Sequence, residues 1–183
     1  MMKSRVRIFF SSALLAYTTA FAQNDHDHDH YLKKQSSATS AKNADRINLD
    51  PETKKYLLAA LEINENLHTS FFDYNAGKVE KYAGELSLSL SQIKDPKISR
   101  KLQYSLQKLN DIKAQNDRKI NNMSYHSVSM TLIHLIHTYN LGNTYKGYTC
   151  PMVKMKWVQN SKKMSKVHNP YAPEMKHCGS QES

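Results

Sequence analysis

Hydrophobic residues recur at helical spacing through the middle of the chain, over residues 46–141. Asp50-Pro51 predicts the start of a first helix, because a capping side chain there precedes a proline at the first helical position. The apolar positions that follow match one buried helix face: Leu57, Leu61, Leu67, Phe71 and Phe72. We expect this helix to end near Gly77.

The same pattern predicts three more helices. The second carries Val79, Tyr82, Ala83, Leu86, Leu90 and Ile93, and the third, opened by Asp95-Pro96, carries Ile98, Leu102, Leu106, Leu109 and Ile112. A fourth runs from near Lys119 to Leu141-Gly142. The alternation of apolar and polar residues that is typical of β-strands is nearly absent, and the connections between the helices are short. We therefore predict an all-α, up-down-up-down four-helix bundle, followed by an irregular segment rich in Cys and Met.

The fourth predicted helix carries two different faces. At about 100° per residue, one arc is an ordinary core face made of Tyr125, Val128, Leu132, Leu135, Ile136 and Tyr139. The opposite arc holds Met123, His126, Met130, His134 and His137. Imidazole and thioether groups three or four residues apart can converge on one copper ion, so this stripe is a candidate metal surface. The alternative is ordinary surface histidines and methionines that pack under the C-terminal segment.

The N-terminal residues have the order of a secretory signal peptide. Three basic residues between positions 3 and 7 precede the apolar run Ile8–Ala20, and Ala20-Phe21-Ala22 supplies a small-residue cleavage site. The run is too short to span a bilayer, and no later segment approaches the roughly 20 apolar residues that a spanning helix needs. We therefore predict a signal peptide over residues 1–22, a periplasmic or secreted protein, and no transmembrane segment after cleavage.

Residues 23–45 are polar and almost free of large apolar side chains, which is typical of a disordered leader. Carboxylate and imidazole groups alternate within it from Asp25 to His30. On a flexible chain, His26, His28 and His30 are suited to collecting Zn(II), Cu(II) or Ni(II) weakly. The alternative is a solubilising leader that binds no ligand.

Composition narrows the class of protein. The chain has 183 residues, five glycines and a mean hydropathy of −0.68, which excludes a multi-span membrane protein and leaves little room for glycine-rich phosphate loops. Metalloprotease and serine-hydrolase motifs do not occur, so we expect that the protein is not an enzyme. Removal of the signal peptide lowers the formal charge from +10 to +7, and without a recognition motif this charge does not predict nucleic acid as a partner.

Soft metal ligands concentrate in residues 142–183. A thiol and a thioether stand two residues apart beside a proline, and a second thioether and thiol follow at a spacing of three. If the two ends of the segment meet, the sulfur atoms surround one point and select Cu(I), with Ag(I) as a surrogate. The candidate ligands are Cys150, Met152, Met175 and Cys178, with His177 and His168 as additions.

Charge favours the same metal. From Gly142 onward seven Lys residues face two Glu residues, so the segment offers no carboxylate cage for Ca²⁺ or Mg²⁺. Nearby lysines also lower the pKa of thiols and thereby enrich the thiolate that binds metal. Outside the cytosol, however, a lone cysteine pair is usually a disulfide, so a structural Cys150–Cys178 bond is the competing interpretation.

Four short elements follow one another here: Cys150-Pro151-Met152, Trp157-Val158, Asn169-Pro170-Tyr171 and Met175-Lys176-His177-Cys178-Gly179. In this order they resemble the uncharacterised-function domain of secreted bacterial proteins, a helical domain that is also fused to copper/silver efflux membrane-fusion proteins. Tyr125-His126-Ser127-Val128-Ser129 is similar to a helix element of that family, although residues 153–156 depart from the small residues it usually has after Cys-Pro-Met. Tyr148 to Met152 also resembles a short element of heavy-metal-binding domains in copper transporters. The resemblance covers residues 46–179, leaves 180–183 as a tail, and implies metal handling.

Together these features predict a periplasmic protein that binds Cu(I) or Ag(I), for metal buffering or for delivery to an efflux or resistance system. Cys150 and Cys178 would be anionic ligands and Met152 and Met175 neutral ones, with aromatic side chains shielding the site. The expected partners are the metal ion and an efflux adaptor or metallochaperone protein. The alternative is a non-metal interaction module that has a structural disulfide and docks an acidic partner on its basic surface.

Overall fold

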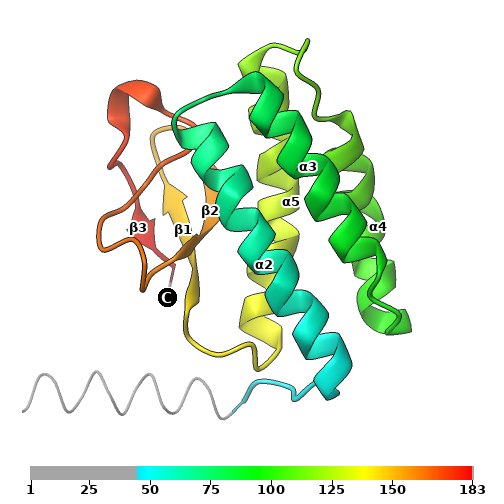
Figure 1. The fold of residues 1–183 in the computed structure, drawn as a ribbon. Coiled ribbons are helices and arrows are strands. Elements are labelled where there is room, and N and C mark those ends of the chain that lie inside the picture. The colour runs from blue at the N-terminus through cyan, green and yellow to red at the C-terminus, as the bar shows by residue number, and fades with distance from the viewer. Residues whose placement is uncertain (1–44, 183) are drawn as a thin grey trace, which may run out of the picture. The chain divides into compact units, whose positions relative to one another are not determined.

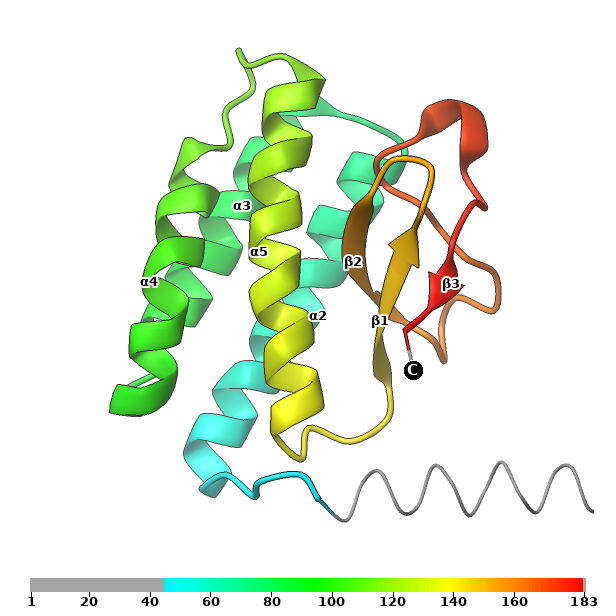
Figure 2. The ribbon, with the colours of Figure 1, turned by 180° about the vertical axis from the view of Figure 1, so that it is seen from behind.

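The computed structural model describes residues 45–182, so the predicted signal peptide and the leader histidines His26, His28 and His30 lie outside the described residues. Four helices make up most of the described chain: α2 (Pro51–Phe72), α3 (Ala76–Ser91), α4 (Pro96–Asp111) and α5 (Arg118–Thr138). Consecutive helices pack side by side and run in opposite directions (Figures 1 and 2). The predicted helical core is therefore confirmed.

Local capping explains where three of these helices begin. The side chains of Asp50, Asn75 and Asp95 each accept a hydrogen bond of 2.9 Å from a backbone N–H group in the first turn of α2, α3 and α4. The first helix ends at Phe72 and not near Gly77 as expected, because Asn75 already caps α3 and Gly77 lies inside that helix.

The apolar helix faces form one core. The predicted core face of the fourth helix is buried along its whole length, from Tyr125 in α5 to Tyr139, the residue that follows α5. Phe71 of α2 stacks on Tyr125 with ring centroids 4.5 Å apart, and the Tyr125 hydroxyl donates to Oδ1 of the buried Asn64 at 3.2 Å. These contacts join the first helix to the last and close the bundle.

The C-terminal segment contains a sheet, so the predictions of a purely all-α fold and of an irregular segment were wrong. β1 (Tyr145–Cys150) and β2 (Met155–Asn160) form an antiparallel hairpin, and β3 (Ser180–Gln181) pairs with the other edge of β1. The strands have six residues or fewer, and β1 pairs with a strand far along the chain, so local periodicity does not reveal them. Ser180 and Gln181, expected in a tail, belong to this sheet.

The sheet lies against one side of the helices. β2 contacts α5 and α2, β1 contacts α5, and Figure 2 shows the hairpin beside these helices. The chain between β2 and β3 includes the 3₁₀ helix η1 (Pro173–Met175) and returns to β1. Among residues 45–182, no helix combines the length and the apolar character needed to cross a bilayer.

Candidate metal centre

The two cysteines meet at the end of β1. Cys150 is the last residue of that strand and is fully buried, and Cys178 lies two residues before β3. Their Sγ atoms are 2.6 Å apart although 28 positions separate them along the chain, and no disulfide joins them in this structure. The pairing of Thr149 with Ser180 explains this meeting, because it sets the two chain segments side by side.

Hydrogen-bond donors surround the Cys150 sulfur. Burial opposes its ionisation, but hydrogen bonds from Cys178, from the backbone N–H groups of Val153 and Met152, and from the Asn169 side chain hold the pKa of the Cys150 thiol below its ordinary value. The contact with Cys150, together with burial, raises the pKa of the Cys178 thiol. Cys150 is therefore the thiol that ionises first, and a thiolate, not a thiol, is the form in which a cysteine can act as a metal ligand.

Asn169 connects the loop between β2 and β3 to Cys178. Its side chain is buried, its Nδ2 donates to the carbonyl oxygen of Cys178 at 3.1 Å, and its Oδ1 accepts from the backbone N–H of Tyr171 at 2.9 Å. Its own backbone N–H donates to the carbonyl oxygen of Lys176 at 2.8 Å. The Asn-Pro-Tyr element thus closes the loop that carries Cys178.

Aromatic rings pack against one another beside this loop. Trp157 on β2 is fully buried, stacks on Tyr148 at 5.9 Å between ring centroids, and lies edge-on to Tyr171 at 6.2 Å. Gly179 follows Cys178 with φ of +140°, and a Cβ atom there would lie 2.7 Å from the Trp157 ring and 2.8 Å from the Thr149 carbonyl oxygen. A glycine is therefore required where the chain passes between the Trp157 ring and β1.

The two predicted thioether ligands stand in different surroundings. Met152 lies in the turn after β1 with its backbone N–H beside both sulfur atoms, but its side chain is 69% exposed. Met175 is half-buried at the end of η1, and its carbonyl oxygen accepts from the backbone N–H of Cys178 at 2.9 Å. Both methionines are adjacent to the thiols through their backbones, and the Met152 thioether would have to turn inward to bind an ion held there.

His168 and His177 lie side by side on the loop between β2 and β3. Their ring centroids are 5.8 Å apart, and His168 stacks on Phe72 of α2 at 4.7 Å. Burial and then the neighbouring His177 lower the pKa of His168, so its ring is neutral at pH 7. The loop thus carries a pair of imidazoles, and one of them, His177, directly precedes Cys178 in the sequence.

The predicted stripe on α5 is divided. Met130, His134 and His137 are exposed, whereas His126 is half-buried against β2 and its Nδ1 accepts a hydrogen bond of 3.0 Å from the backbone N–H of Lys156. Met123 and His126 line a cavity of about 610 Å³ beside the β1–β2 turn. In the described part of the chain, no group of three or more His, Cys, Asp or Glu side chains surrounds one point. The stripe and the C-terminal donors therefore do not form one large cluster.

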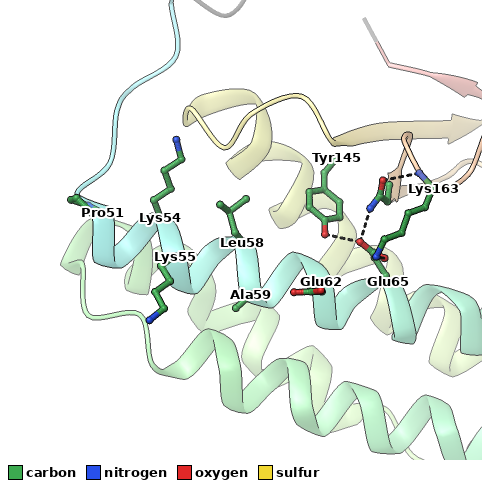
Figure 3. A pocket seen from close by; sticks show the side chains of 10 residues that line it. Pro51, Lys54, Lys55, Leu58, Ala59, Glu62, Glu65, Tyr145 and Lys163 are labelled. Atoms are coloured by element: carbon green, nitrogen blue, oxygen red, sulfur yellow. Dashed lines mark hydrogen bonds and ion pairs between the residues drawn. The ribbon is translucent and has the colours of Figure 1, made fainter.

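A carboxylate that the sequence analysis did not single out joins α2 to the sheet. Glu65 accepts hydrogen bonds from the Tyr145 hydroxyl at 2.6 Å, from Asn160 Nδ2 at 2.7 Å and from Lys163 Nζ at 2.7 Å, beside a cavity of about 710 Å³ (Figure 3). Burial opposes ionisation, but these three bonds hold the pKa of Glu65 below its ordinary value. Nothing in the sequence distinguishes Glu65 from other helical charges, because its partners lie far along the chain.

Sequence analysis also missed His68, a buried histidine of α2. Its Nε2 donates to the carbonyl oxygen of His168 at 2.8 Å, and burial lowers the pKa of its imidazole to about 4. Its Nδ1 has no hydrogen-bond partner among the described residues. His68 is therefore a neutral anchor for the backbone that carries His168.

Comparisons with protein-family models, with curated proteins and with solved structures found no match to this chain.

Proposed function

We propose that the protein binds Cu(I), with Ag(I) as a surrogate, through Cys150 and Cys178 after export to the periplasm. The contact between the two sulfur atoms carries this proposal, because residues 28 positions apart are brought within reach of a single ion. We place the protein in metal buffering or in delivery to an efflux or resistance system, with an efflux adaptor or a metallochaperone as its partner. Its role is binding rather than catalysis.

The chemistry around the sulfur atoms supports a soft monovalent ion. Backbone and amide N–H donors stabilise the Cys150 thiolate, and thiolates are the preferred ligands of Cu(I). Metal–sulfur bonds of about 2.3 Å place two sulfurs of one ion roughly 3.7–4.6 Å apart, so binding requires the pair to open from its present contact. Cys178 lies on the loop segment, whereas Cys150 lies in a strand, so we assign the movement to Cys178.

The surroundings of the cysteine pair also favour a soft ion over a hard one. The exposed Met152 side chain stands in the turn next to the pair, where it can supply a neutral third ligand from the solvent side. The excess of lysine over glutamate after Gly142 disfavours hard divalent ions at this end of the molecule. The order of the four C-terminal elements, which resembles a domain fused to copper/silver efflux proteins, is in keeping with this role.

The same sulfur contact favours a second candidate function. A disulfide needs the sulfur atoms at about 2.05 Å, a smaller movement from 2.6 Å than metal binding needs. In this alternative the bond ties the loop to β1, and the protein is a periplasmic interaction module whose basic surface docks an acidic partner.

A competition titration with a coloured Cu(I) chelator, performed on the reduced mature protein without oxygen, tests the proposal. We expect one Cu(I) per chain, and Cys150→Ser or Cys178→Ser to weaken binding by about 100-fold or more. Met152→Leu and Met175→Leu should each weaken binding by about tenfold without changing the circular dichroism. Met164→Leu, a half-buried methionine after β2, is the matched control and should leave the affinity unchanged.

Thiol counting, combined with the titration, distinguishes the metal-binding protein from the disulfide-bonded module. Thiol counting on protein isolated from the periplasm should find two reactive cysteines if the pair carries metal. An oxidised pair that takes up no Cu(I) even after reduction would instead support the disulfide-bonded module. Unchanged affinity in both methionine variants would remove those residues from the ligand set.

A further inference from the structure

We infer that His168 and His177 form a second metal site, separate from the thiol pair, for a borderline divalent ion such as Zn(II) or Cu(II). Both imidazoles lie on the loop between β2 and β3, with ring centroids 5.8 Å apart. This site goes beyond the proposed Cu(I) function, because its ligands are nitrogen atoms and its ion is divalent.

His177 presents the nitrogen that a metal needs. Its Nδ1 lies 2.7 Å from the carbonyl oxygen of Val167, and a carbonyl only accepts, so Nδ1 carries the proton. The neutral ring then has its lone pair on Nε2. A hydrogen bond from one ring nitrogen to a backbone carbonyl is also the usual way in which a metal-binding histidine is oriented.

His168 is held in place by several contacts. Its backbone N–H donates to Gln159 Oε1 at 3.0 Å, and its carbonyl oxygen accepts from the buried His68 at 2.8 Å. Its ring stacks on Phe72 with centroids 4.7 Å apart and planes at 17°. Because backbone and ring are both fixed, little conformational entropy is lost when the imidazole binds an ion.

The separation of the rings fits a shared ion. With metal–nitrogen bonds of about 2.0–2.1 Å, two imidazoles on one ion place their centroids roughly 5–6.5 Å apart, for angles from tetrahedral to linear. The observed 5.8 Å lies within this range. The distance between the two rings is therefore compatible with both binding one ion.

The imidazole pair and the thiol pair are two sites. Within residues 45–182 no three side chains of the His, Cys, Asp and Glu classes converge on a point, so His168 and His177 do not share an ion with a cysteine in this arrangement. Water must supply the remaining ligands, as in an open site. Ca²⁺ and Mg²⁺ prefer oxygen ligands, so the imidazole nitrogens of this pair select a borderline ion instead.

Titration with Zn(II), followed by NMR of the histidine ring nitrogens, tests the site. The protein is the full mature chain with His26→Gln, His28→Gln and His30→Gln, which removes the leader imidazoles. We expect the Nε2 resonances of His168 and His177 to shift together and to saturate at one ion. His177→Gln, at an exposed position, should abolish the shift of His168 and weaken Zn(II) binding at these rings by about tenfold or more.

The control is Glu62→Gln, an exposed carboxylate of α2, which should change neither the shifts nor the affinity. Shifts confined to His134 and His137, shifts of only one loop ring, or unchanged His168 shifts in the His177→Gln variant would each overturn the site. Because the readout assigns individual rings, zinc that binds only the cysteines also counts against it. The Cu(I) titration is independent, so failure of either proposal leaves the other standing.

Discussion

The side-chain amide of Asn169 donates a hydrogen bond to the carbonyl oxygen of Cys178 at 3.1 Å. This bond joins two residues of the segment between β2 and β3, and it helps to hold the second cysteine near the end of β1. The geometry of the cysteine pair therefore depends on a buried amide as well as on the strands.

Removal of this amide should loosen the Cys178 segment. In Asn169→Ala the Cys178 carbonyl and the Tyr171 N–H lose their partners in a buried place, so we expect the free energy of unfolding to fall by about 2–4 kcal/mol. Urea denaturation followed by Trp157 fluorescence measures the change. Asn140→Ala, which removes an exposed amide contact with Asn48, should cost less than about 0.5 kcal/mol. Equal losses in the two variants would contradict the special position of Asn169.

Gly179→Ala should destabilise the protein by about 2–3 kcal/mol. The new Cβ would lie 2.7 Å from the Trp157 ring and 2.8 Å from a backbone oxygen, at a φ that favours glycine. Gly84→Ala is the matched control, since, apart from its chain neighbours and the backbone of its own helix, no heavy atom of the described residues lies within 4 Å of its Cβ position in α3. Because alanine favours a helix, this control should gain about 0.5–1 kcal/mol. Thermal unfolding of both variants measures these changes in stability. A Gly179→Ala protein as stable as the wild type would refute the steric argument.

Glu65→Gln should lower stability by about 1–2 kcal/mol at pH 7 and flatten its decline in acid. The folded-state pKa of Glu65 is depressed, so its contribution is present above the unfolded value of about 4.3 and is lost as the pH falls through the lower folded value. Urea unfolding midpoints measured from pH 7 to pH 3 give the dependence of stability on pH. The exposed neighbour Glu62→Gln should reproduce the wild-type slope. Parallel curves for wild type and Glu65→Gln would show that the carboxylate is not stabilised by folding.

Arg118 fastens the start of α5 to two other segments. Its Nη2 donates to the carbonyl oxygens of Phe71 at 3.0 Å and Pro170 at 3.1 Å, and its guanidinium lies 4.7 Å from the Tyr74 ring centroid. Arg118→Lys keeps the charge but loses the planar fork, so we expect a loss of about 1 kcal/mol. Arg100 is exposed and its Nε donates to the carbonyl oxygen of Pro96 in its own helix at 3.2 Å, so Arg100→Lys should be neutral in the same denaturation assay.

The sequence by itself determined the helices. Caps at Asp50 and Asp95 and the apolar spacing of Tyr125 to Tyr139 depend on residues within a few positions of one another, and the structure has helices at these places. The sequence also indicated both cysteines as candidate ligands, and the Asn-Pro-Tyr element as part of a pattern that resembles a known family. It did not show what Asn169 does, since the partner atom belongs to Cys178.

The tertiary structure alone decided the sheet and the partners of the polar side chains. β1 pairs with Ser180 and Gln181 across a long loop, Glu65 meets donors from β1, β2 and the chain after it, and His126 accepts from the backbone of β2. Each of these contacts joins segments distant along the chain, and their register follows from how the sheet packs on α2 and α5. Local sequence patterns encode backbone preferences and amphipathic faces. Contacts between segments that are distant along the chain depend instead on how the whole chain packs.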